Sequence, residues 1–304
     1  MKIGFGTQLW LKDRHYENFH RMLDEMALVG LDGFEMCYPF LIEWYEHDPL
    51  ELKKLLGMHG LELGSYYTGI GFGHKDTIRG QVEEFKRRCR FVRQVGGQYV
   101  LLDGGEKDWQ RDYRDVDEYI QVIADTANEL GQYARSNGLT LAWHQHWGSV
   151  FEDESAFKRL MELTDPGWVG FCPDVGQLAL CGFDVAATIR AFLERIEFVH
   201  YKDITFAGRP EGELWAGGIR APADPGAYNV DSRGRWVELG RGVVPFPEIT
   251  SILLSAGYDG WFMDDFDYSG YSPRESAKAC KDYLNHGLGL WGARDLNSNV
   301  GKGS

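Results

Sequence analysis

The sequence predicts an α/β fold, a single (β/α)8 TIM barrel with a long insertion after its seventh strand. A recurring phrase carries this prediction: an amphipathic stretch stops at glycine, and a short run follows that is apolar at odd and even positions alike, as in QVGGQYVLLDG and RSNGLTLAWHQH. Helices that end at glycine and strands that are apolar on both faces are typical of parallel βαβ units. The phrase recurs often enough to give eight strands in 304 residues, which suits a closed barrel of about 250 residues plus insertions.

The expected strands follow one another at regular spacing along the chain. They lie at residues 2–9, 33–37, 61–67, 98–103, 139–146, 168–174, 196–202 and 259–265. Helical patterns of roughly 10–20 residues separate them. We expect one barrel over residues 1–290 and a flexible polar tail over 291–304. Because barrel chemistry sits at the C-terminal ends of the strands, functional residues are expected there.

One stretch interrupts the repeat. Residues 204–243 are rich in glycine, proline, arginine and aromatic residues and show no sustained periodicity. Loops of this length inside a compact domain are usually functional covers or disordered segments. Trp215, Tyr228 and Trp236 favour an ordered cover over the mouth of the barrel, and a contact between subunits is the alternative.

Composition narrows the class of protein. Hydrophobic residues make up 43% of the chain, yet no apolar run approaches the ~20 residues that a membrane span needs. The N-terminus leads directly into the first strand without the apolar stretch of a secretory signal, so a cytoplasmic protein is expected. The 46 acidic residues exceed the 32 basic ones, which disfavours nucleic acid as a partner, and the five cysteines lack CxxC spacing and are expected to be buried thiols.

Polar residues gather at the ends of the last four strands. Residues two apart on a strand share a face, and by this rule the sequence places histidines, carboxylates and a lysine on one rim: His144, His146, Asp174, His200, Lys202, Asp265 and Asp267. A mixed set of imidazole and carboxylate donors suits a divalent Mn²⁺, Mg²⁺, Co²⁺ or Zn²⁺ ion. Because no thiolate joins the set, a catalytic ion with open positions is favoured over a closed structural zinc site.

Several short motifs carry a resemblance to a known family. HQHWGS at 144–149 followed by Glu152 resembles an HxHxGT…E element, DVG at 174–176 resembles DxG, HYKD at 200–203 resembles HxKD, and ELGRG at 238–242 resembles ELGxG. The chain thereby resembles the xylose-isomerase-like superfamily of sugar isomerases, epimerases and dehydratases, from Ile3 to about Leu290. The similarity is greater to the inosose dehydratase branch and to the catalytic subunit of C-glycoside deglycosidases.

This resemblance implies one divalent ion, Mn²⁺ before Mg²⁺, Co²⁺ or Zn²⁺, with Asp174, His200 and Asp265 among its ligands. The first ligand is either Glu152, which we favour, or His144, because many members have glutamate where this chain has His144. Asp265 stands where glutamate is commoner, and its shorter reach would shift the ion or admit a water.

The chemistry expected of such a site begins with a C–H bond next to a ketone. A divalent ion that chelates the ketone oxygen and a neighbouring hydroxyl stabilises the enediolate formed when the adjacent proton leaves. We expect His146 as the base, with His144 also in the catalytic set, since histidine titrates near neutral pH. Lys202 is expected to steady the oxyanion or protonate a leaving group, and a salt bridge to Asp203 or Asp174 is the alternative.

The expected function is that of a metal-dependent lyase. Its substrate would be a keto-sugar or keto-cyclitol, as in inosose dehydration, or a 3-keto-glycoside or C-glycoside, cleaved by α-proton abstraction and β-elimination. A sugar isomerase or epimerase using the same enediolate and a non-catalytic accessory subunit are the alternatives, and a small second subunit or a homo-oligomer stays open. A nuclease on the same scaffold is disfavoured by the acidic excess. Expected substrate contacts are Gln177, Trp10, Tyr67, Glu238 and Arg241.

Overall fold

The strands form one parallel sheet that curls into a barrel, which confirms the predicted fold. The computed structural model describes residues 1–11, 15–37, 39–206, 234–267 and 269–295. The sheet has the order β6-β5-β4-β3-β2-β1-β10-β7. Its strands are β1 (Lys2–Gly6), β2 (Gly33–Met36), β3 (Glu62–Gly69), β4 (Tyr99–Asp103), β5 (Thr140–His144), β6 (Val169–Cys172), β7 (Val199–Tyr201) and β10 (Trp261–Asp264).

Strands β6 and β7 stand at the two ends of this order, and backbone hydrogen bonds join them. The amide of Glu197 donates to the carbonyl of Phe171 at 3.1 Å, and the amide of His200 donates to the carbonyl of Pro173 at 3.0 Å. The second contact sets Asp174 beside His200 as an isolated parallel bridge. Closure of the barrel therefore brings two of the predicted ligands together.

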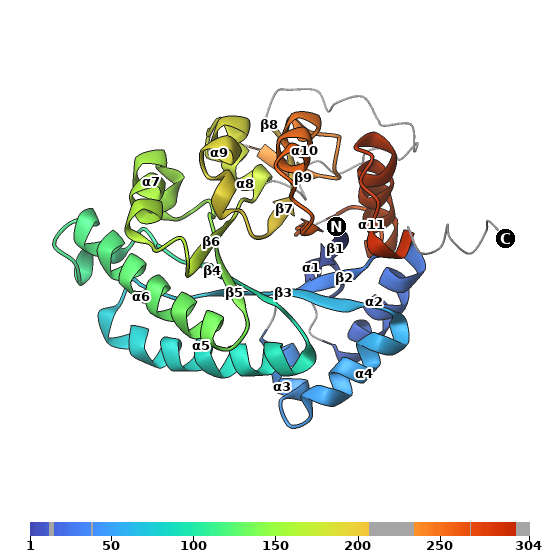
Figure 1. Ribbon diagram of the computed structural model, residues 1–304, viewed down its shortest axis with the longest axis horizontal. Helices are drawn as coiled ribbons and strands as arrows, with labels where there is room; N and C mark the ends of the chain where they lie inside the picture. The colour runs from blue at the N-terminus through green and yellow to red at the C-terminus, as the bar shows by residue number, and fades with distance from the viewer. Residues whose placement is uncertain (12–14, 38, 207–233, 268, 296–304) are drawn as a thin grey trace.

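Helices surround the strands as an outer ring (Figure 1). They are α1 (Gln8–Leu11), α2 (Tyr16–Val29), α3 (Phe40–Tyr45), α4 (Pro49–His59), α5 (Lys75–Val95), α6 (Val116–Ser136), α7 (Glu154–Leu163), α8 (Val175–Leu180), α9 (Val185–Ala191), α10 (Phe246–Ser255) and α11 (Pro273–Asp282). The expected glycine caps are present, since α2 and α5 end at Gly30 and Gly96 with φ of 82° and 108°. Among the described helices none is long and apolar enough to cross a membrane.

The barrel interior has an apolar layer beneath the polar rim. Side chains from β4, β5, β6 and β10 and from the residue before β7 pack there as one buried cluster of Leu101, Ala142, Cys172, Phe198, Trp261 and Met263. Gly4 makes room for this layer, because a Cβ atom on it would lie 2.6 Å from the Cε atom of Met263. The filled interior leaves the C-terminal strand ends as the place for polar groups.

The insertion after β7 begins with strand β8 (Asp203–Phe206), and strand β9 (Gly234–Val237) follows later in it. The two strands pair in antiparallel fashion as a separate two-stranded sheet. Trp215 and Tyr228 lie outside the described residues, whereas Trp236 is buried in β9. Asp203, at the start of β8, holds the segment between β9 and α10, because its carboxylate accepts four backbone N–H bonds, from residues 204, 240, 242 and 244, at 2.8–3.2 Å. Burial raises the pKa of Asp203 to about 7 although these hydrogen bonds oppose the shift.

Two ends of the chain differ from the expectation. Strand β1 stops at Gly6 instead of residue 9, and α1 begins at Gln8, so Trp10 belongs to a helix. At the other end, the first residues of the predicted tail contact the barrel, where the backbone amide of Arg294 donates to Asp32 at 2.8 Å.

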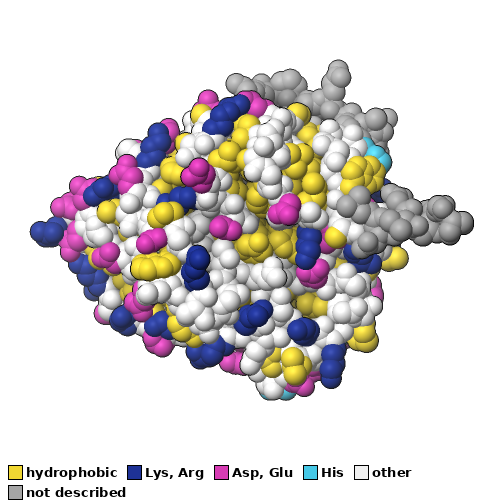
Figure 2. Space-filling view, viewed as in Figure 1, with side chains coloured by type: hydrophobic (Ala, Val, Ile, Leu, Met, Phe, Trp, Pro, Cys, Tyr) yellow, Lys and Arg dark blue, Asp and Glu magenta, His cyan; other side chains and the backbone are white. Residues whose placement is uncertain are grey.

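The outer surface carries charges of both signs. Figure 2 shows basic and acidic side chains interspersed over one face, with apolar side chains between them. Many of these charges pair across neighbouring helices, as Lys75 does with Glu118 at 2.8 Å and Arg79 with Glu129 at 2.7 Å. Exposed pairs of this kind contribute little to the stability of the fold.

Candidate active site

Four of the predicted rim residues converge at the C-terminal end of the barrel. They are His144, the last residue of β5, Asp174 directly before α8, His200 in β7, and Asp265 directly after β10. All four are buried, and one ligand atom from each lies within 4.8 Å of the others. We call this set the His2Asp2 cluster. Its composition, two imidazoles and two carboxylates, is a donor set for a divalent transition ion.

Several donor atoms of the cluster lack a hydrogen-bond partner among the described residues. They are both ring nitrogens of His144, Oδ2 of Asp174 and Nδ1 of His200. The other oxygen of Asp174 caps α8, accepting from the amides of Gly176 and Gln177 at 3.0 and 2.9 Å. Buried polar atoms without partners are costly, and a bound cation would satisfy them together. The residues present therefore fit a divalent ion.

Burial sets the charge of two cluster members. It raises the pKa of Asp174 to about 6, while the positive charge of Lys202 opposes the shift. It lowers the pKa of His144 well below the ordinary histidine value, and the neighbouring His200 and His146 lower it further. A neutral imidazole keeps the lone pair that a metal ion requires.

Asp265 is held on both sides. The side-chain amide of Gln8 donates to its Oδ1, and Nζ of Lys202 donates to its Oδ2 at 2.8 Å. Lys202 also pairs with Oδ2 of Asp267 at 2.6 Å and stands 4.7 Å from the ring centre of Trp236. Burial would lower the pKa of Lys202, but the two carboxylates outweigh it and raise that pKa well above its usual value. Lys202 is therefore a buried ammonium group beside the cluster.

Glu152, the first ligand that the sequence favours, is not brought into the cluster. Its carboxylate accepts from the backbone amide of Gly148 and from Nζ of Lys107, the latter at 2.7 Å. Both partners lie in loops at the rim, where Ser149 caps the short turn Val150–Glu152. The structure brings His144, and not Glu152, into the cluster, and which of the two is the first ligand stays a prediction.

His146 follows β5 and lines a cavity of about 260 Å³ at the rim. The other lining residues come from the ends of β3, β4 and β5 and the loops after them: Gly69, Ile70, Gly71, Asp103, Gly104, Glu106, Trp147, Gly148 and Ser149. Nδ1 of His146 lies 2.5 Å from the carbonyl oxygen of Trp147, which can only accept, so the proton of the neutral ring is on Nδ1. Nε2 then carries the basic lone pair.

The predicted substrate contacts divide into two groups, and the first lies beside the cluster. The ring of Tyr67 stands edge-on to that of His144 with centroids 5.0 Å apart, and its hydroxyl donates to Asp103 at 2.5 Å. Gln177 is buried, and its Oε1 accepts from the amide of Trp147 at 3.2 Å.

The described contacts of the second group are with residues outside the His2Asp2 cluster. The indole of Trp10 packs on Phe5 and donates to Glu25 at 2.7 Å. Glu238 and Arg241 pair with each other at 2.9 Å, and Glu238 also accepts from hydroxyl groups near α11. A role in substrate binding stays a prediction for all of these residues.

Three polar residues near the cluster were not singled out from the sequence: Gln8, Glu35 and Asp103. Glu35 accepts from Nε2 of His200 at 3.0 Å, and Asp103 lines the rim cavity. The signal was available, since Glu35 and Asp103 stand at the ends of the apolar runs GFEMC and YVLLD, where the rule applied to the later strands would have placed them on the rim.

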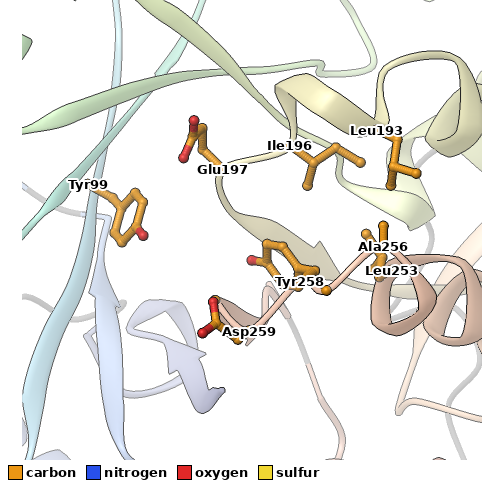
Figure 3. A pocket seen from close by; sticks show the side chains of 10 residues that line it. Tyr99, Leu193, Ile196, Glu197, Leu253, Ala256, Tyr258 and Asp259 are labelled. Atoms are coloured by element: carbon orange, nitrogen blue, oxygen red, sulfur yellow. The ribbon is translucent and has the colours of Figure 1, made fainter.

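A second cavity of about 260 Å³ lies at the opposite ends of the strands. Figure 3 shows Tyr99, Glu197, Tyr258 and Asp259 around it, next to the starts of β4, β7 and β10. In barrel enzymes this end serves stability rather than catalysis. The His2Asp2 cluster and the rim cavity together are therefore the candidate active site.

Known proteins share this architecture over nearly the whole chain. Inosose dehydratase of Geobacillus kaustophilus is 26% identical over 302 residues, which cover 93% of this chain and 94% of that protein. The solved 3-keto-D-glucoside 4-epimerase YcjR from E. coli and the IOLI protein with a binding zinc atom are each 16% identical with a TM-score of 0.69, covering 94% of this chain and 99% and 97% of theirs. The model of the family described as xylose isomerase-like TIM barrel matches residues 23–284. With this match over most of its length and a buried His2Asp2 cluster at the rim, the chain belongs to the xylose isomerase-like TIM-barrel family.

Proposed function

We propose that this protein is a divalent-metal-dependent lyase that acts on a keto-sugar or keto-cyclitol. The reaction would remove a proton next to the ketone and expel a β-substituent from the resulting enediolate. Inosose dehydratases match the chain over 93–95% of its length, and the name of that activity describes an elimination from a keto-cyclitol. At 26–27% identity this similarity supports the reaction class and leaves the leaving group open between water and an aglycone.

The His2Asp2 cluster would hold the ion, with His144 in place of Glu152 as the first ligand. When bound, a divalent ion supplies Lewis-acid polarisation of a ketone oxygen and its neighbouring hydroxyl. We propose Mn²⁺, with Mg²⁺, Co²⁺ and Zn²⁺ as alternatives. The observation that carries the proposal is the set of buried, unpartnered donor atoms that these residues turn toward one another.

His146 would act as the base. It lies two residues beyond His144, outside the cluster, and its ring centre is 5.8 Å from that of His144. Because Nδ1 donates a hydrogen bond to the carbonyl oxygen of Trp147, Nε2 is the nitrogen able to take the proton from the substrate's carbon. The rim cavity that His146 lines gives the substrate a place within reach of that nitrogen.

Lys202 would act at the other side of the reacting carbons. Its ammonium group is buried between two carboxylates and covered by Trp236, so it stays protonated and can share a hydrogen bond with an oxyanion. Donation to a departing oxygen would require the substrate to displace one of these carboxylates, because the ion pairs hold the proton. A base and a separate acid beside one ion are what a β-elimination requires.

Epimerisation through the same enediolate is the second candidate. It is favoured by the solved neighbour named as a 3-keto-D-glucoside 4-epimerase, whose name describes an epimerisation at the carbon next to a ketone. In that case the enediolate would be reprotonated instead of losing a substituent. A non-catalytic accessory subunit is disfavoured, because such a chain has no need to keep four buried donors together.

Proton NMR in D₂O tests the proposal. Mn²⁺-loaded protein is incubated with scyllo-inosose and, separately, with a 3-keto-glycoside, and the ion is removed before acquisition. Loss of the α-proton signal with an enone or a released aglycone is the expected result. Exchange with an inverted centre and no elimination would favour the epimerase, and no exchange with either ketone would count against the proposal.

The matched variant is His146→Gln. It should bind Mn²⁺ as the native protein does and show no exchange of the α-proton. A His146→Gln protein with native exchange rates would remove His146 from the base role.

A further inference from the structure

Glu35 is a buried carboxylate that the proposed reaction does not use. It lies in β2, is 1% exposed, and faces the barrel interior, where its Oε2 accepts from the hydroxyl of Ser65 at 2.6 Å. Ser65 is its register partner on β3, so the neighbouring strand fixes this hydrogen bond. The thiol of Cys37 donates to the other oxygen at 3.5 Å. A carboxylate buried this deeply is held in one place by the groups that donate to it.

The third donor to Glu35 is a member of the His2Asp2 cluster. Nε2 of His200 lies 3.0 Å from Oε2 of Glu35, although the two residues are 165 positions apart in the chain. A carboxylate only accepts hydrogen bonds, so Nε2 of His200 must carry a proton. In a neutral imidazole the lone pair is then on Nδ1.

Nδ1 of His200 is the nitrogen that faces the other ligands. It is buried without a hydrogen-bond partner among the described residues and lies 3.8 Å from Oδ2 of Asp265. The His200 ring also stands 4.9 Å from the ring of His144, centre to centre. The two nitrogens of one ring therefore have separate surroundings, a carboxylate on one side and the cluster on the other.

We infer that Glu35 is a positioning residue that fixes the tautomer and orientation of His200, so that Nδ1 is the atom offered to the metal ion. Glu35 itself lies outside the set of four ligands. A carboxylate behind a ligating histidine locks the ring and raises its basicity, and loss of such a partner typically weakens metal binding about 10- to 100-fold. The metal part of this inference rests on the proposed function, whereas the tautomer of the metal-free protein does not.

The test reads the tautomer directly. Long-range ¹H–¹⁵N NMR of protein labelled with ¹⁵N-histidine distinguishes a protonated ring nitrogen from one with a free lone pair, and the His200 signals are assigned by their loss in His200→Gln. The spectrum is recorded at a pH high enough for the ring to be neutral, because the pKa of His200 is raised well above its ordinary value. In metal-free native protein we then expect the single ring proton on Nε2 of His200. A proton on Nδ1 alone would overturn the inference, whatever the metal binding shows.

Three variants separate positioning from general support of the fold. Glu35→Gln replaces the acceptor by an amide that can present either a donor or an acceptor to Nε2, so the preference for one tautomer should be lost and Zn²⁺ should bind about 10- to 100-fold more weakly. Ser65→Ala should leave the tautomer in place with a smaller loss. Cys172→Ala removes the thiol that also interacts with His200, and it should leave tautomer and affinity unchanged.

The outcomes are distinguishable from failure of the proposed function. Native protein that binds neither Zn²⁺ nor Mn²⁺ but holds His200 as stated would contradict the metal site and support the role of Glu35. A Glu35→Gln protein with native Zn²⁺ affinity and an unchanged tautomer would refute the role of Glu35 and leave the metal site standing. Circular dichroism of each variant checks that the barrel is folded.

Discussion

Replacing His144 with alanine decides which residue is the first ligand. The His144 ring is 1% exposed, and neither of its nitrogens has a hydrogen-bond partner among the described residues, so the change deletes a candidate ligand without breaking a hydrogen bond. Structural zinc sites with four ligands bind with about 10–16 kcal/mol. An even share is about 2.5–4 kcal/mol for each ligand, or about a 100- to 1000-fold loss of affinity.

The assay is a titration of metal-free protein with Mn²⁺ or Zn²⁺, followed by calorimetry and by the rise in melting temperature that bound ion produces. The rise depends on the ratio of ion to dissociation constant, so a 100-fold weaker site loses about 2.7 kcal/mol of stabilisation at high ion concentration. His146→Ala is the matched control, because it removes an imidazole two positions away that lies outside the cluster. Its affinity should stay close to the native value.

Glu152→Gln provides the opposing test. The carboxylate of Glu152 contacts Gly148 and Lys107 at the rim and lies outside the cluster. The Glu152→Gln protein should therefore bind metal as tightly as the native protein. If Glu152→Gln lost affinity 100-fold while His144→Ala kept it, the first ligand would be Glu152, and the loop after β5 would have to move on binding.

Three further predictions follow from the same contacts. In Asp203→Asn an NH₂ group replaces one of the two oxygens that accept backbone hydrogen bonds, so some of these N–H groups lose their acceptor. The free energy of unfolding should fall by about 2–4 kcal/mol in chemical denaturation. Metal affinity should fall on acidification through about pH 6, because the raised pKa of Asp174 leaves that ligand protonated below it, and calorimetry at pH 5 to 8 would show this. Lys202→Met should tighten metal binding by at least about tenfold and reduce turnover, because it removes a cation bonded to Asp265; weaker binding would contradict this.

The sequence was sufficient for the barrel and most of its cluster because both depend on local patterns. Apolar runs bounded by glycine predicted strand positions such as 33–37, which the structure has as β2, and the residues that end the later strands meet at one rim as expected. The rule failed where a strand ended early. Strand β1 stops at Gly6, so Trp10 lies in α1 with its indole bonded to Glu25, while Gln8 contacts Asp265.

Strand patterns in the sequence do not tell whether Glu152 or His144 lies in the cluster, because the answer depends on the path of the loop after β5. Both residues follow the same apolar run, and a carboxylate eight residues on could in principle fold back to the rim. The turn capped by Ser149 instead holds Glu152 against Gly148. The hydrogen bonds of this turn lie within residues 148–152, and the ion pair with Lys107 adds a contact from a loop distant in sequence. Strand periodicity reports neither contact.

The sequence shows the position of Glu35 but does not show its role. Its position at the end of an apolar run was visible, but its meaning depends on His200, which lies across the interior on a strand that is separated from β2 by β1 and β10 in the sheet. Only the curvature of the sheet around the interior brings the two together. Pairings across a closed sheet are where a residue's role depends most on the fold and least on its neighbours in the chain.

The donor set also bears on which ion the site prefers. Two carboxylates alone would suit Mg²⁺, whose ligands are oxygens in a strict octahedron, whereas each imidazole shifts preference toward transition ions. This chain offers two imidazoles, one kept neutral by burial and one turned toward the cluster by Glu35. A glutamate in place of His144 would make the site harder and more anionic. We therefore expect Mn²⁺, Co²⁺ or Zn²⁺ to bind more tightly than Mg²⁺ in a competition titration. Lys202, which is ion-paired with Asp265, would offset part of the negative charge that attracts any cation.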